Sequence, residues 1–153
     1  MSVLDWTPAK RLTVAIRKRF GKAPHAGPGK EFVSLSPVEI PESLLLTLGE
    51  TVLAEIHNKQ GCRFFFSDSR VYLEREAGFV RIPYVTITAC NWIDDTPDLV
   101  ERARKKRKHG DRIIIHDQYG GRHELDDLGL AFPAMYEFFF WLMKKRGFLP
   151  KQE

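Results

Sequence analysis

The residues that could support chemistry are few and scattered along this 153-residue chain. His116 and His123 flank Tyr119-Gly120, and they would face each other across a hairpin only if its turn holds two residues. Two imidazoles do not complete a metal site without further ligands. Cys62 and Cys90 lack the spacing of a zinc site or a disulfide framework, so we expect free thiols. The sequence thus indicates no metal and no cofactor.

Motifs for acid–base or nucleophilic catalysis are missing. Asp94-Asp95 and Asp126-Asp127 are adjacent pairs at predicted strand ends, where turn and capping roles are expected. Neighbouring side chains on a strand point to opposite faces, so such pairs rarely converge. The chain has no phosphate-binding Gly-rich loop, no G-x-S-x-G and no H-E-x-x-H. We therefore predict a protein that is not an enzyme; an enzyme built from dispersed residues is the alternative left open.

The sharpest feature is a run of basic residues. Residues 102–112 carry seven Lys or Arg against one acid, whereas residues 31–101 carry five bases against twelve acids. Such a run could be a solvated helix end stabilised by its dipole. It could also bind an acidic partner, or the phosphates of an anionic membrane or a nucleic acid. The predicted binding residues are Arg102, Arg104, Lys105, Lys106, Arg107 and Lys108.

A second cationic segment lies near the N-terminus. Thr7-Pro8 suits a helix start and Gly21 a helix stop, and Ala9, Leu12, Ile16 and Phe20 form one apolar stripe between them. We expect this stripe to pack on the C-terminal helix rather than on a membrane. The bases away from the stripe form a predicted secondary basic surface: Lys10, Arg11, Arg17 and Lys18.

The chain divides into an appendage and a body. Residues 22–30 are rich in Pro and Gly and predict a linker, so residues 1–30 are a basic helix with its linker and residues 31–153 one domain. The sequence of the body predicts a helical turn over 42–48 and a basic helical insert over about 95–111. Seven short antiparallel strands are expected from its β-branched and aromatic runs, at 52–57, 62–67, 70–76, 79–84, 86–93, 112–117 and 122–125.

The last predicted element is a helix over 133–146 with Gly147 as its stop. Its apolar arc covers roughly half the helix circumference, which is wider than one packing surface needs. The surplus face must be covered, and the N-terminal helix or a second chain could do this. A homodimer is therefore left open.

Three short motifs in the body resemble those of bacterial pleckstrin-homology-like (PH-like) domains. They are Gly49-Glu50-Thr51-Val52-Leu53, Phe66-Ser67-Asp68-Ser69-Arg70-Val71-Tyr72-Leu73 and Ile82-Pro83-Tyr84-Val85-Thr86-Ile87. The resemblance implies a mainly β fold, a seven-stranded antiparallel barrel or orthogonal sandwich closed by a C-terminal helix. It also implies a binding or scaffolding module. The first hairpin offers only Lys59 and Arg63, fewer bases than phosphoinositide-binding relatives gather there.

Together these features predict a non-enzymatic PH-like module whose ligand is another protein, docked through the basic insert. The alternative is a peripheral binder of anionic membrane or nucleic acid through its basic segments. Nucleic acid is less favoured, because no aromatic residues are interleaved with the basic run. The N-terminus lacks the apolar core of a secretory signal, so a cytoplasmic location is expected, at the membrane surface under the alternative.

Overall fold

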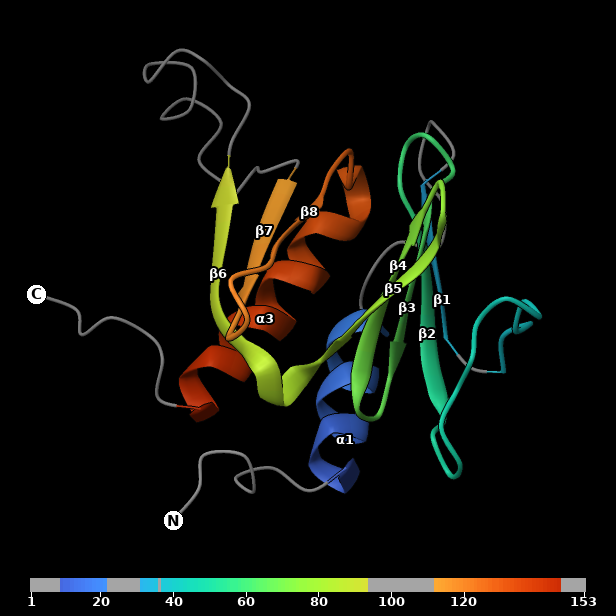
Figure 1. The fold of residues 1–153 in the computed structure, drawn as a ribbon, viewed down its shortest axis with the longest axis horizontal. Helices are drawn as coiled ribbons and strands as arrows, with labels where there is room; N and C mark the ends of the chain where they lie inside the picture. The colour runs from blue at the N-terminus through green and yellow to red at the C-terminus, as the bar shows by residue number, and fades with distance from the viewer. Residues whose placement is uncertain (1–8, 22–30, 36, 94–111, 147–153) are drawn as a thin grey trace, which may run out of the picture.

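The computed structural model describes residues 9–21, 31–35, 37–93 and 112–146, and its fold is mainly β (Figure 1). The predicted insert over 95–111 lies outside the described residues. The elements are α1 (Ala9–Phe20), β1 (Phe32–Leu35), β2 (Val52–His57), β3 (Arg63–Ser67), β4 (Arg70–Arg75), β5 (Gly78–Pro83), the 3₁₀ turn η2 (Tyr84–Thr86), β6 (Ile87–Ile93), β7 (Arg112–Asp117), β8 (Arg122–Leu125), the 3₁₀ turn η3 (Gly129–Ala131) and α3 (Phe132–Arg146).

The strands form two antiparallel sheets. The first sheet holds β1 to β5 in chain order, and the second holds β6, β7 and β8. The turn η2 separates β5 from β6, so the chain leaves the first sheet there and pairs with β7 instead. Among the described residues the sheets share no strand pair, so the expected closure into a barrel is wrong. Besides the seven expected strands, the described residues form an additional strand, β1, which pairs with β2.

Both helices pack between the two sheets, as Figure 1 shows. Leu12, Ile16 and Phe20 of α1 belong to one core cluster together with residues of both sheets and of α3. The ring of Phe20 lies 4.8 Å from that of Phe66 in β3 and 6.1 Å from that of Phe138 in α3. The prediction that the N-terminal helix packs on the C-terminal helix is therefore confirmed.

The first sheet buries both of its faces. In β3, Phe64 and Phe66 point into the main core, whereas Phe65 lies on the outer face with Tyr72 of β4. A loop over residues 37–49, which joins β1 to β2, covers this outer face by inserting Leu44. This is why three consecutive phenylalanines are all buried, a pattern that one-sided burial would not produce.

The helical turn predicted over 42–48 is wrong. The loop instead makes two separate tight turns, closed by hydrogen bonds from Leu44 N to Pro41 O and from Glu50 N to Thr47 O. A helix would place Leu44 and Leu48 on the same face. In the structure Leu44 is buried against the sheet, whereas Leu48 is fully exposed.

Candidate binding surfaces

The predicted basic residues fall in two groups. The basic insert, residues 102–108, lies outside the described residues. On α1, Lys10 is the second residue, and Arg11, Arg17 and Lys18 are exposed to solvent. Among the described residues no helix is long and apolar enough to cross a membrane.

A groove of about 450 Å³ runs between α1 and α3. It brings Lys18, from the predicted basic surface, together with residues of α3 that the sequence did not single out as a site. Its walls combine three cations, three aromatic rings and one acid: Lys18, Arg19, Tyr136, Glu137, Phe140, Trp141 and Lys144.

Two pairs of side chains in this groove contact each other: Arg19 with Trp141, and Tyr136 with Phe140. The guanidinium carbon of Arg19 lies 5.3 Å from the ring centroid of Trp141, and its Nη1 donates to Ala15 O at 3.3 Å. Such a cation over an aromatic face is attracted by the electrons of the ring. Tyr136 and Phe140 sit one turn apart with ring centroids 6.0 Å apart, and Phe140 remains 41 % exposed. The groove therefore presents a surface that is both aromatic and cationic.

The 37–49 loop forms a second surface, on the outer face of the first sheet. Leu44 is buried against Phe65 and Tyr72, and Val38 and Leu46 pack on the same cluster. Three other apolar side chains of this loop are exposed to solvent: Ile40, Leu45 and Leu48. Leu45 is 67 % exposed and Leu48 is fully exposed. These exposed side chains are accessible to another molecule.

Glu50 fastens the end of this loop to the sheet. Its carboxylate accepts hydrogen bonds from Tyr72 Oη at 2.7 and 2.8 Å, from Ser67 Oγ at 2.5 Å and from Thr47 N at 3.0 Å. Burial alone would raise the pKa of Glu50, but these bonds outweigh it and the pKa is lowered. Glu50 thus stays ionised at neutral pH and keeps the loop in one conformation.

This network predicts a loss of stability at alkaline pH. Burial, and then the hydrogen bond to Glu50, raises the pKa of Tyr72 from 10.0 to about 12. A pKa that is raised by folding contributes stability below the unfolded value, and this is lost as pH rises through the folded value. The free energy of unfolding should therefore fall between pH 10 and about 12, by about 2 kcal/mol from Tyr72.

Urea titrations across this pH range test the assignment. Tyr72→Phe should remove part of the alkaline loss of stability. Buried Tyr84, whose pKa burial also raises, accounts for part of what remains. Equal slopes in wild type and Tyr72→Phe would show that Tyr72 is not coupled to folding.

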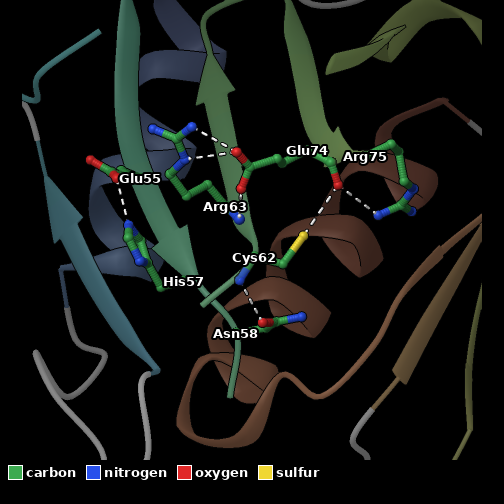
Figure 2. A network of polar contacts seen from close by, with 7 residues as sticks. All are labelled: Glu55, His57, Asn58, Cys62, Arg63, Glu74 and Arg75. Carbon is green, nitrogen blue, oxygen red and sulfur yellow. Dashed lines mark hydrogen bonds and ion pairs between the residues drawn. The ribbon is translucent and has the colours of Figure 1, made fainter. Parts of the chain in front are cut away.

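A polar network crosses the outer side of the first sheet (Figure 2). Arg63 of β3 donates from Nε and Nη2 to Glu74 Oε2 in β4, at 3.1 and 2.6 Å. Glu55 Oε2 lies 2.6 Å from His57 Nε2, and the His57 ring stacks on Phe32 of β1. The Arg63–Glu74 ion pair joins the neighbouring strands β3 and β4, which stabilises the sheet, whereas Glu55 and His57 lie two residues apart on β2.

The cysteines are not activated as nucleophiles. Cys62 Sγ donates to Glu74 O at 3.2 Å, and burial is the main cause that raises the pKa of its thiol (Figure 2). Burial also raises the pKa of Cys90. A reactive cysteine requires a lowered pKa, so both thiols remain protonated at neutral pH. Both are free, as expected from the sequence.

The hairpin histidines do not face each other. His123 pairs with Ile115 and His116 with Arg122, because the turn spans the four residues 118–121. His123 Nε2 instead lies 2.8 Å from Asp117 Oδ2, and this hydrogen bond is the main cause that lowers the pKa of Asp117. Within the ranges that the structure describes, no three His, Cys, Asp or Glu residues form a metal-binding group.

No known family model, curated protein or solved structure matches this chain. The assignment of the two surfaces therefore rests on the geometry and charge of the residues that form them. The groove joins a helix from each end of the chain, and the loop lies on the opposite side of the first sheet.

Proposed function

We propose that this chain is a non-enzymatic PH-like binding module whose ligand is a protein segment with acidic and apolar side chains. The order of the elements supports the PH-like assignment: a meander of strands β2 to β5, then the three strands β6 to β8, then a closing helix. The strand β1 and the helix α1 are additions to that plan. Fold alone does not establish function, so the binding assignment depends on the groove.

The groove between α1 and α3 is the observation that carries this proposal. Aromatic and arginine side chains contribute most of the energy at protein interfaces, and here Tyr136, Trp141 and Arg19 line one concave surface. Lys18 and Lys144 add positive charge at the walls, against Glu137 as the single acid of the lining. A ligand that complements this surface is apolar on one side and acidic on another.

The same groove suits protein better than nucleic acid or a phosphoinositide. Base stacking needs an open aromatic face, but Arg19 already lies over Trp141, and Phe138 is stacked beside that ring. On the first PH-like hairpin, Arg63 is engaged by Glu74 and is not available as a headgroup ligand. The basic insert, predicted from sequence to be the docking element, has the same charge sign as the groove and would favour the same acidic partner.

Peptides of defined chemistry test the proposal. The probe is a fluorescent amphipathic helical peptide with leucines on one face and glutamates on the other, and its control has lysine for each glutamate. We expect the glutamate peptide to bind, and Lys18→Glu with Lys144→Glu to weaken its binding by about tenfold. Arg11→Glu with Lys145→Glu makes the same charge change on the same two helices outside the groove, and should change affinity much less.

Equal affinity for the two peptides would contradict the proposal, as would equal losses in the groove variant and its control. A further variant with residues 104–108 changed to serine is expected to weaken the same binding. Retention on phosphatidylserine vesicles or on polyuridylate at low salt, with neither peptide bound, would instead favour the peripheral membrane or nucleic-acid alternative. Steep loss of that retention with added salt would accompany it.

A further inference from the structure

We propose that the groove binds the 37–49 loop of a second copy of this chain, so that copies associate head to tail. This inference rests on the proposed function of the groove and names its partner. It is drawn from two surfaces of the same molecule that are complementary in charge: a groove lined by three cations and one acid, and a loop with exposed apolar and acidic side chains.

The loop has the chemistry that the groove requires. Leu45 and Leu48 are exposed apolar side chains, and Glu39 and Glu42 are exposed acids in the same loop. Residues 37–49 contain no lysine or arginine. Leucines could therefore contact the aromatic rings of the groove while the glutamates meet its cations.

The loop is also anchored to its own molecule before it binds a partner. Leu44 is buried on the outer face of the first sheet, and Glu50 accepts a hydrogen bond from Thr47 N at 3.0 Å. Thr47 Oγ1 donates to the same carboxylate at 3.2 Å. Because the loop is already ordered, little conformational entropy is lost when it binds.

The loop of one molecule cannot reach the groove of the same molecule. The loop packs on the outer face of the first sheet with Phe65, whereas α1 packs on the inner face with Phe66. In Figure 1 the first sheet stands between the teal loop and the two helices. The contact must therefore form between copies.

An interface of this kind is heterologous, because each copy uses two different surfaces. A linear assembly leaves one groove unoccupied at one end and one loop unoccupied at the other, unless the rotation between copies closes a ring. The proposed module would thus build rings or short linear assemblies. This property is suited to a scaffold.

Sedimentation equilibrium at low salt tests the inference with two charge-reversed variants. The groove variant carries Lys18→Glu and Lys144→Glu, and the loop variant carries Glu39→Lys and Glu42→Lys. Wild type should show a weight-average mass that rises with concentration above that of one chain, 17.7 kDa. Each variant alone should lose this rise and remain at the mass of one chain.

An equimolar mixture of the two variants is the decisive sample. The intact loop of the groove variant can enter the intact groove of the loop variant, and the reversed loop of the loop variant can enter the reversed groove of the groove variant. The mixture should therefore recover the concentration-dependent rise in mass that each variant alone has lost. Combining all four changes in one chain should restore the concentration-dependent rise, because the reversed charges attract again.

Several outcomes would overturn the inference. They are a wild type that stays at the mass of one chain at every concentration, a loop variant that associates as wild type does, and a mixture of the two variants that does not associate. A wild type that does not associate but binds the glutamate peptide would contradict this inference and leave the proposed function standing. A protein that neither associates nor binds the peptide would contradict both.

Discussion

Replacing Phe20 by alanine should lower the free energy of unfolding by about 3–5 kcal/mol, the range for a large aromatic removed from a core. The Phe20 side chain is 1 % exposed and contacts the rings of Phe66 and Phe138. Its removal would leave a cavity at the point where α1, the first sheet and α3 meet. Urea unfolding of wild type and variant measures the difference.

The same substitution should weaken binding in the groove. The helix α1 supplies one wall through Lys18 and Arg19, and Phe20 is the neighbouring anchor that fixes this wall against α3. Val14→Ala is the matched control, since Val14 lies on the same helix and is 60 % exposed. A Phe20→Ala variant as stable as Val14→Ala would show that α1 is not packed into the core as described.

The strand pattern is the part of the fold that sequence predicts best. The bounds of β2, β7 and β8 coincide with the predicted ones, and those of β3 to β6 differ by one residue at one or both ends. These strands are bounded by short polar turns, such as the one that contains Gly120 with a φ of 83°. Turn residues act locally, so one sequence is enough to locate them.

Elements that depend on contacts between residues far apart in the sequence could not be predicted from local turn residues. The four residues of β1 are too few to show an alternating pattern, and the strand forms by pairing with β2 across the 37–49 loop. That loop is rich in leucine and favours a helix locally. Its observed conformation depends instead on Phe65 and Tyr72. The loop covers these two side chains, which lie on the outer face of the first sheet.

The sequence predicts only part of the candidate site. The unusually broad apolar arc of the last helix predicts that something must cover it, and α1 does so in part. What remains uncovered is the groove, and its key pair, Arg19 and Trp141, comes from opposite ends of the chain. Only the packing angle of two helices brings such residues together, and no spacing rule in one sequence reveals it.

Arg146→Met should destabilise the protein by about 3 kcal/mol or more, because it leaves several buried carbonyl oxygens without a donor. Sequence places Arg146 among three bases in the last turn of a helix, where a role in complementing the dipole is expected. Instead its side chain is buried, and burial lowers its pKa. Its guanidinium donates to Tyr84 O at 2.9 Å, to Val85 O at 2.6 Å and to Ile87 O.

These three carbonyls belong to η2 and the start of β6, where the chain passes from the first sheet to the second. Arg146 therefore ties the end of α3 to the junction of the sheets. Arg146→Lys keeps the positive charge but lacks the planar guanidinium with its several donors. This variant should therefore be less stable than wild type and more stable than Arg146→Met. Lys145→Met, at the exposed neighbouring position, should have little effect.

The comparison of these variants separates charge from hydrogen-bond geometry. If Arg146→Lys were as stable as wild type, a positive charge at the helix end would be sufficient and the planar guanidinium would not matter. If Arg146→Met were as stable as Lys145→Met, the carbonyls of η2 would have to find other donors, and the junction would not depend on Arg146. The structure predicts neither result, because the three carbonyls converge on the guanidinium of one buried residue, Arg146, which is 4 % exposed.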